Sequence, residues 1–483
     1  MKKTILLILI IVCSVVTFSL SAQNTNKNEA VQLAQNFIRA RSGSLVVSNA
    51  EPLIFTADTV AWIVHCQPQG FVVISTSRIM TPVIAWSDEG NFFEGKGWET
   101  FLPIFRNDLA TRKQLARISV KEIEINRQKW NYWLDLKGKV NDYQQWPPVG
   151  WTTTGGWLKT NWTQDAPYNN FCPIDGQTHT RSYAGCPATA MGQIVNYHHD
   201  LHTTQFSDAD DYYHNYGTGN QYWIDNDWAA YEFPSWHQLN IYLDTLAAHY
   251  QQAISLTDDD GAALTYACGA AAKQVYSSSG SGTYGISQAY DAYIRFGYGD
   301  AQLLYPADTT LNTHLAGNMK LGLPAHLGLV NPAQTVGHNV VVDGYNTDDF
   351  YHFNFGWGGS SNGWYTMPPT SIPYDLTVIE GVVLDINLSH PPVGLPHETS
   401  AIDQPVMSYL NEAEILRVML PENSCCCNVS VFDASGRKLL NIPVPQTNCK
   451  NPNDIRLNSL NRGLYIATIR TTDGKSHKLK FIK

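Results

Sequence analysis

Residues 182–197 are the stretch that most constrains how this 483-residue chain can fold. Gly185 lets the backbone turn sharply, and Pro187 suits the first position of a helix. Small and apolar residues follow, so Cys186 is expected at a helix N-terminus. Unpaired N–H groups and the helix dipole stabilise a thiolate at such an end. The stretch therefore predicts a nucleophilic Cys186 with a lowered pKa, and the alternative is a buried structural cysteine.

A thiol nucleophile needs a base, and His338 is the candidate because it begins an apolar, strand-like run. A second apolar run follows after a turn at residues 346–349. Two antiparallel strands joined there would bring Asn354 close to His338. We expect His338 to take the thiol proton and Asn354 to fix its tautomer, while Trp357 shields that contact. The alternative for each residue is simple packing at a strand end.

Gln164 precedes the nucleophile in a loop rich in tryptophan and polar residues. Its side-chain amide, together with the backbone N–H of Cys186, is a candidate oxyanion hole. A lone glutamine in a loop is usually solvated surface. The hypothesis therefore depends on the order Gln164, Cys186, His338 and Asn354 along the chain.

The length of the chain indicates about two to four domains. Lys2 and Lys3 precede an apolar run that ends in small residues near Ala22, which is typical of a secretory signal peptide. An uncleaved membrane anchor is the alternative. The predicted segments are a signal peptide at 1–22, a first domain at 23–146, a main domain at 147–388, a proline-rich linker at 389–402 and a last domain at 403–483.

Local patterns predict an α+β chain. Residues 29–41 have apolar side chains at helical spacing, and residues 61–75 indicate a β-hairpin around Pro68, Gln69 and Gly70. Residues 98–136 are charged and helix-like. Short apolar runs separated by Asp-Gly and Ser-Gly turns from residue 408 onward predict a small β-sandwich.

Charge and cysteine spacing exclude several classes of protein. The formal net charge of -10, without a basic stripe, makes nucleic acid a poor partner. The nine cysteines form no paired CxxC sets, so they predict no zinc site. His198, His199 and His202 are interpreted as the solvated end of the helix rather than as metal ligands. After the signal, no stretch is apolar enough to be a transmembrane span.

The segments around Gln164, Cys186, His338 and Asn354 resemble, in this order, the streptopain family of papain-like cysteine peptidases, of the interpain and periodontain type. The resemblance covers residues 150–385. It implies a papain-like fold of two subdomains, a helical part and an antiparallel sheet. It also implies hydrolysis of protein or peptide substrates through a Cys-His pair and a covalent acyl-enzyme, without a metal or organic cofactor.

The resemblance assigns roles to residues one by one. Cys186 matches the nucleophile, His338 the general base and Gln164 the oxyanion-hole glutamine. Asn354 and Trp357 match the segment that orients the histidine, and which of the two does so stays open. Phe355 stands where the family often has tryptophan. The loop at residues 277–282 resembles the substrate-side wall, which implies substrate contacts for Ser279, Gly280 and Gly337; a flexible surface loop is the alternative.

The flanking domains carry resemblances of their own. Residues 23–146 resemble the inhibitory α+β pro-domain of the family, with a cut expected near Pro147, within residues 141–150. Residues 403–483 resemble the C-terminal sorting domain of the type IX secretion system. The implied partners are the chain's own pro-domain as inhibitor and the secretion machinery. The implied location is outside the cell or on the outer-membrane surface of a Bacteroidetes-like bacterium.

Two other functions share parts of this pattern. A different secreted Cys-His acyl-transfer enzyme, such as a peptidoglycan endopeptidase, would have the same nucleophile and another substrate. A catalytically dead surface adhesin would keep the scaffold, but the retained Gln164, Cys186 and His338 argue against it. The walls of the specificity pocket cannot be placed from the sequence, and a hydrophobic pocket is the expectation.

Overall fold

The computed structural model describes residues 24–41, 45–92, 98–115, 120–135, 143–217, 219–331, 333–368, 378–387, 406–410, 415–419, 427–433, 437–444, 453–461, 463–470 and 476–483. The predicted signal peptide, the proline-rich linker and part of the predicted cut region, residues 141–142, lie outside these residues. The chain divides into two compact units, Met1–Pro392 and Val393–Lys483.

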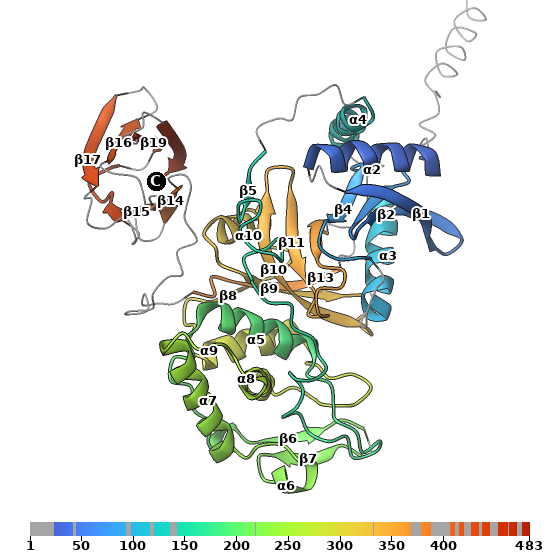
Figure 1. The fold of residues 1–483 in the computed structure, drawn as a ribbon, viewed down its shortest axis with the longest axis vertical. Coiled ribbons are helices and arrows are strands. Elements are labelled where there is room, and N and C mark those ends of the chain that lie inside the picture. The colour runs from blue at the N-terminus through green and yellow to red at the C-terminus, as the bar shows by residue number, and fades with distance from the viewer. Residues whose placement is uncertain are drawn as a thin grey trace, which may run out of the picture. The chain divides into compact units, whose positions relative to one another are not determined.

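The first part of the larger unit is an α+β domain (Figure 1, blue and cyan). The helix predicted at residues 29–41 and the hairpin predicted at 61–75 are both confirmed. The described parts of residues 98–136, predicted to be helix-like, form two helices. The elements are α2 (Lys27–Arg41), β1 (Val46–Phe55), β2 (Asp58–Gln67), β3 (Phe71–Ser75), β4 (Val83–Ser87), α3 (Trp98–Leu115) and α4 (Val120–Leu134).

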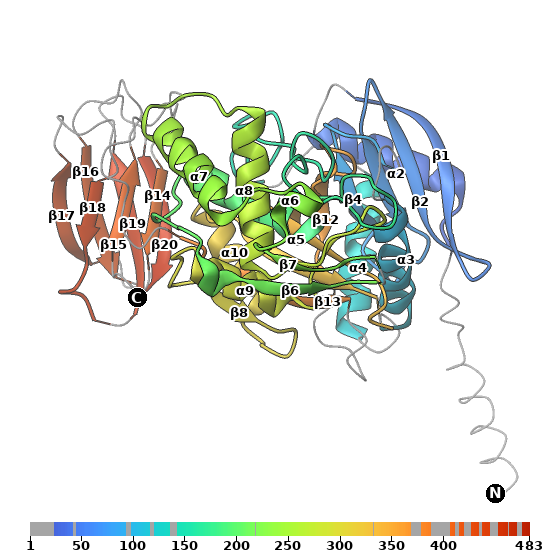
Figure 2. The ribbon, with the colours of Figure 1, turned by 90° about the horizontal axis from the view of Figure 1, so that it is seen from below.

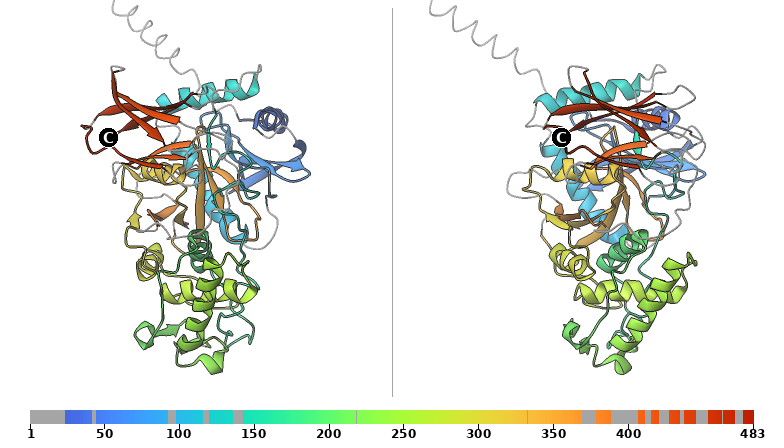
Figure 3. Two further views of the ribbon diagram at one scale, coloured as in Figure 1. Left: turned by 60° about the vertical axis from the view of Figure 1, so that its left-hand side comes forward. Right: turned by 90° about the vertical axis from the view of Figure 1, so that its left-hand side faces the viewer.

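The second part of this unit has a helical subdomain and a sheet subdomain. The helices are α5 (Cys186–His198), the 3-10 helix η1 (Asp208–Asp210), α6 (Trp228–Tyr231), α7 (Trp236–Gln251), α8 (Asp258–Ala271), α9 (Ile286–Arg295) and α10 (Leu311–Lys320). The strands are β5 (Gln145–Trp146), β6 (Tyr212–Asn215), β7 (Gln221–Ile224), β8 (Gln302–Leu304), β9 (Ala325–Val330), β10 (Gly337–Asn346), β11 (Phe350–Asn354), β12 (Gly363–Thr366) and β13 (Ile379–Leu384). Figure 3 shows the green helices of this part below its tan and orange strands, β9 to β13.

One antiparallel sheet runs through both parts of the larger unit. Its order is β1-β2-β3-β4-β12-β11-β10-β9-β13-β8, with β5 paired to β10. The junction is the pairing of β4 with β12, where Trp86 lies opposite Trp364 and their rings stack at 6.1 Å. The first domain is therefore joined to the second by backbone hydrogen bonds as well as by side-chain packing.

Helix α5 lies at the centre of the helical subdomain and packs against α8 and β10. All ten residues from Pro187 to Asn196 are buried. Each buried methylene contributes about 0.8 kcal/mol, so this packing fixes the helix firmly. The other face of the sheet is covered by α3 (cyan in Figure 2), whose Phe101, Ile104 and Phe105 share a core with Phe353 and Phe355.

The smaller unit is a β-sandwich, as predicted. Its two sheets have the orders β14-β15-β18 and β17-β16-β19-β20. Val429, Val431, Ala467 and Ile469 are among the residues of its core. The strands are β14 (Val406–Leu410), β15 (Ile415–Met419), β16 (Cys427–Asp433), β17 (Lys438–Val444), β18 (Asn453–Arg456), β19 (Leu464–Arg470) and β20 (Ser476–Ile482).

Within the described part of the chain, the helices are all too short or too polar to cross a membrane.

Candidate active site

Cys186 is the first residue of α5, as the sequence predicted. Gly185 before it has a φ of 84°, a left-handed conformation that favours glycine. A Cβ on Gly185 would lie 2.5 Å from Oε1 of Gln274, which is too close. Gln274 also donates from Nε2 to the carbonyl of Ala184 at 2.7 Å. The turn before the cysteine is therefore fixed both by its own geometry and by a buried glutamine.

The thiol of Cys186 differs from the other cysteines described. It is partly exposed, whereas Cys66, Cys172 and Cys268 are buried. Burial nevertheless raises the pKa of Cys186 above its ordinary value, and hydrogen bonds from Asn339 oppose that rise. The predicted lowering of the pKa is therefore wrong for this structure, because desolvation of the thiolate outweighs the helix end.

His338 is the second residue of β10, and its ring is buried. Nε2 lies 3.0 Å from the carbonyl oxygen of Phe355. Because a carbonyl only accepts, Nε2 must carry the hydrogen, which leaves Nδ1 as the basic nitrogen. The ring stacks on Trp357 with centroids 4.5 Å apart and planes 24° apart. Burial lowers the pKa of His338 to about 4, so the imidazole is neutral at pH 7.

The side chain of Asn354 forms no hydrogen bond with the ring of His338. Its Nδ2 donates to the carbonyl of Thr160 at 2.9 Å, and its Oδ1 accepts from the backbone N–H of Gly356 at 3.0 Å. Its amide also pairs with that of Gln193 on α5, at 3.2 and 3.3 Å. Asn354 therefore fastens the helix to the sheet, while the Phe355 carbonyl and the Trp357 ring orient the histidine.

The hydrogen bonds of Cys186 and His338 lead to different partners. Nδ2 of Asn339 lies 3.8 Å from the Cys186 sulfur, while the imidazole bonds to Phe355. Between these two described side chains there is no hydrogen bond. The structure thus holds a neutral thiol and a neutral imidazole that have not formed an ion pair.

The remaining candidates lie on loops tied to the turn before Cys186. The backbone N–H of Ala184 donates to the carbonyl of Gln164 at 2.9 Å. The backbone N–H of Tyr183 donates to the carbonyl of Ser277 at 3.1 Å, and Ser277 bonds to Ser279 through their hydroxyl groups at 2.9 Å. The structure therefore brings the predicted glutamine and the serine-rich loop to the residues beside the nucleophile.

The three predicted substrate-side residues, Ser279, Gly280 and Gly337, are all exposed. Gly337 is the first residue of β10 and lies opposite Val330, directly before His338. Ser278, in the middle of the serine-rich loop, donates from its backbone N–H to Asp175 at 2.8 Å. Asp175 thus anchors the middle of the loop, while Ser279 and Gly280 remain exposed to solvent.

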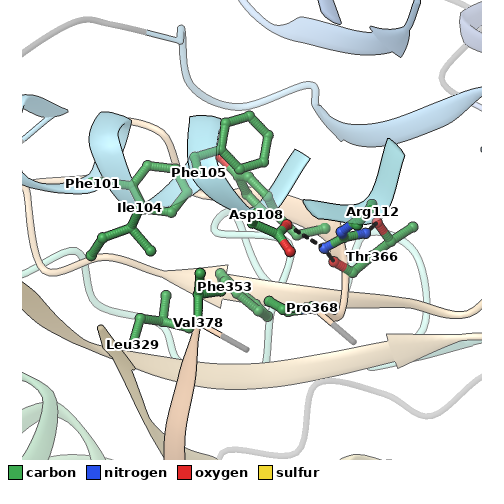
Figure 4. Close-up of a pocket in the computed structure, with 11 residues that line it drawn as sticks. Phe101, Ile104, Phe105, Asp108, Arg112, Leu329, Phe353, Thr366, Pro368 and Val378 are labelled. Atoms are coloured by element: carbon green, nitrogen blue, oxygen red, sulfur yellow. Dashed lines mark hydrogen bonds and ion pairs between the residues drawn. The ribbon is translucent and has the colours of Figure 1, made fainter. Parts of the chain in front are cut away.

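Helix α3 of the first domain packs against the residues that hold the histidine. The ring of Phe101 lies 4.6 Å from that of Phe355 and 6.2 Å from that of Trp357. Figure 4 shows Phe101 and Phe105 on the α3 side of a cavity of about 20 Å³. At its other end Arg112 pairs with Asp108 at 2.7 Å and donates to the carbonyl of Thr366 at 2.9 Å.

Among the described residues, no group of three or more His, Cys, Asp and Glu side chains is arranged to hold a metal ion. His198 ends α5, and His199 caps it in a left-handed conformation with a φ of 52°. Burial lowers the pKa of His198 to about 4.

A helix that begins at a cysteine packs on an antiparallel sheet that carries a histidine, which is the arrangement expected of a thiol hydrolase. Residues 162–365 match the Peptidase C10 family. Residues 22–109 match the Spi protease inhibitor family, and residues 412–483 match the secretion system C-terminal sorting domain.

Individual proteins are similar to parts of this chain. Thiol protease/hemagglutinin PrtT of Porphyromonas gingivalis is 28% identical over 215 residues, which are 42% of this chain and 22% of that protein. Streptopain of Streptococcus pyogenes is 24% identical over 314 residues, covering 62% of this chain and 71% of streptopain. A solved structure of Prevotella intermedia prointerpain A aligns with a TM-score of 0.47 and 22% identity, over 72% of this chain and 100% of that one.

The chain carries a domain of the streptopain-like Peptidase C10 family of cysteine peptidases at residues 162–365. It has a Spi inhibitor pro-domain before the peptidase and a type IX sorting domain after it. The sorting domain indicates a protein of Bacteroidetes that is secreted or attached to the cell surface.

Proposed function

We propose that the chain is the precursor of a secreted cysteine endopeptidase in which Cys186 is the nucleophile and His338 the general base. The observation that supports this most is the bond from His338 Nε2 to the Phe355 carbonyl. It leaves Nδ1 without hydrogen, and Nδ1 is the atom that can take a thiol proton. Cys186 is the partly exposed thiol at the start of α5.

In the proposed reaction the Cys186 sulfur bonds to the scissile carbonyl carbon while its proton passes to Nδ1 of His338. The backbone N–H of Cys186 and the side-chain amide of Gln164 hold the resulting oxyanion. The C–N bond then breaks, and the leaving amine takes the proton from Nδ1. Water, deprotonated by the same imidazole, hydrolyses the acyl-enzyme and restores the thiol.

Trp357 acts as a positioning residue in this proposal, because its ring covers one face of the imidazole. The open tips of the serine-rich loop, Ser279 and Gly280, and of β10, Gly337, form the substrate side of the site. Their exposed backbone groups are suited to pairing with an extended peptide.

The pro-domain is proposed to inhibit by holding the His338 segment against α3. Phe101 packs on Phe355 and Trp357. The raised pKa of the Cys186 thiol and the lowered pKa of the His338 imidazole both disfavour an ion pair between them. Removal of the pro-domain would expose this segment to water and favour charge separation. The predicted domain limits, residues 23–146 and 147–388, stay proposals.

The proposed maturation cut lies in the exposed turn that follows Pro148. Trp146 is held by its pairing with Tyr345, and Pro147 is buried. Val149, in contrast, is 71% exposed, and residues 148–150 lie open to solvent. Proteolysis needs an accessible backbone, so the cut is expected at residues 148–150 rather than at Pro147 itself.

The test is incubation of purified precursor with and without a thiol reductant, followed by N-terminal sequencing of the fragments. The parent protein should cleave itself within residues 148–150 and then digest casein. Cys186→Ala should remain intact and inactive. Maturation and casein digestion by Cys186→Ala at the parent rate would overturn the proposal.

A further inference from the structure

A carboxylate that the proposed mechanism does not use lies on the same face of the sheet as the nucleophile. Asn339 on β10 lies opposite Gly328 on β9, and Gly328 lies opposite Gly381 on β13. The register shifts between Ile379 and Gly381, which makes Glu380 the extra residue of a bulge. Glu380 therefore stands in a row across three strands with Gly328 and Asn339.

The position of the Glu380 carboxylate follows from its distance to Gly328. A Cβ on Gly328 would lie 3.0 Å from Oε2 of Glu380, so the carboxylate lies over Gly328. Cross-strand partners in an antiparallel pair point to the same face, and the side chain of Asn339 reaches the Cys186 sulfur at 3.8 Å. The missing side chain of Gly328 thus leaves Glu380 and Cys186 on one surface, with Asn339 between them.

The Glu380 carboxylate accepts one hydrogen bond and forms no ion pair among the described residues. Oε1 accepts from the backbone N–H of Ile286, at the start of α9, at 2.9 Å. Among the ion pairs of the described residues, none includes Glu380. Its side chain is only partly buried. Burial raises the pKa of Cys186 and the charge of Glu380 adds to that rise, so the two groups are electrostatically coupled.

We propose that Glu380 is a specificity-determining residue that binds a cationic side chain, Arg or Lys, of the peptide substrate beside the scissile bond. This replaces the hydrophobic pocket expected from the sequence, and it rests on the proposed function. An unpaired carboxylate on the same face of the sheet as the nucleophile attracts a guanidinium or ammonium group of a bound peptide. The bound cation also cancels the field that disfavours the Cys186 thiolate.

The experiment compares pairs of fluorogenic peptides that differ only in carrying Arg or norleucine at one position. One pair is made for each of the two residues before and the two residues after the cleaved bond. The matured parent should cleave one Arg peptide with a kcat/KM about tenfold or more above its norleucine partner. Glu380→Gln should abolish that preference and leave the norleucine rates within about twofold. Glutamine retains an oxygen for the Ile286 N–H, so the helix start is preserved.

Asp291→Asn, at an exposed carboxyl on the same helix α9, is the matched control and should keep the parent's preference. Equal cleavage of Arg and norleucine peptides by the parent would overturn the proposal. An equal loss with both peptides in Glu380→Gln would also overturn it, because it would show a purely structural role. If the parent cleaves no peptide, or Cys186→Ala cleaves as well, the proposed function fails, and this inference fails with it.

Discussion

Single residues around the nucleophile decide whether the site can form. Gly185 is the sharpest case, because its left-handed backbone and the nearby Gln274 amide both exclude a side chain. A non-glycine residue in such a conformation costs about 1–3 kcal/mol, before any steric clash. The clash itself would displace Gln274 and release the carbonyl of Ala184.

Gly185→Ala is therefore expected to lower the thermal stability of the precursor and to slow self-cleavage more than tenfold. Differential scanning fluorimetry and gel analysis of maturation are the measurements. Gly299→Ala is the control, because a Cβ there meets nothing within 4 Å. Equal stability and equal maturation rates in the two variants would contradict the steric argument.

The protonation states of Cys186 and His338 give a second prediction at this scale. Burial raises the pKa of the thiol and lowers that of the imidazole to about 4. The precursor should thus react slowly with iodoacetamide at pH 7, with a rate that rises about tenfold per pH unit above neutrality. Mass spectrometry of Cys186 labelling follows the rate. A rate that is fast and constant between pH 5 and pH 8 would indicate a preformed ion pair instead.

At the scale of elements, helix α3 connects the pro-domain to the active-site segment. Phe101 is the contact residue, since its ring meets both Phe355 and Trp357. Phe→Ala substitutions in a packed core cost about 3–5 kcal/mol. Phe101→Ala should therefore loosen the pro-domain and raise the rate at which the intact precursor is labelled by an epoxide inhibitor.

The matched control for that variant is Ile125→Ala on α4, because Ile125 is 43% exposed. It should leave labelling unchanged. A labelling rate for Phe101→Ala equal to that of the control would show that α3 does not restrain the site.

Several of these elements could be predicted from local sequence, and others could not. The start of α5 was predictable because Gly185 and Pro187 act on the local backbone. The Phe355 carbonyl accepts the hydrogen bond that orients His338, and a backbone group cannot be recognised from residue types. The sequence therefore favoured the Asn354 side chain for this role. The sequence reasoning missed Asn339, whose amide reaches the Cys186 sulfur, because an asparagine beside His338 carries no motif of its own. The raised pKa of Cys186 depends on packing from distant segments, which no local pattern records.

At the scale of the whole molecule, pro-domain docking is linked to pH through Glu89, which follows β4. Oε1 of Glu89 and Nε2 of His352 both lie close to Gly155, at 3.0 and 3.3 Å from the Cβ position there. Burial raises the pKa of Glu89 to about 8; His352 opposes this, and the charges of Asp88 and Asp343 add to it. The docked carboxyl thus keeps a proton that it would otherwise lose near its ordinary pKa of 4.5.

Because the docked pKa is the higher one, this contribution to stability is complete below pH 4.5 and is lost as the pH rises through about 8. The thermal midpoint of the Cys186→Ala precursor, which is expected not to cleave itself, should fall over that range. Glu89→Gln in the same background should show a flatter profile, while the raised pKa of His352 leaves part of the slope. Identical slopes for the two proteins would contradict the linkage.

The measurement that tests the whole account most directly is covalent labelling of the matured protein with an epoxide inhibitor, followed by peptide mapping. One adduct per molecule is expected, on Cys186, with loss of proteolysis in proportion to labelling. Full proteolytic activity in protein whose Cys186 is completely modified would contradict it.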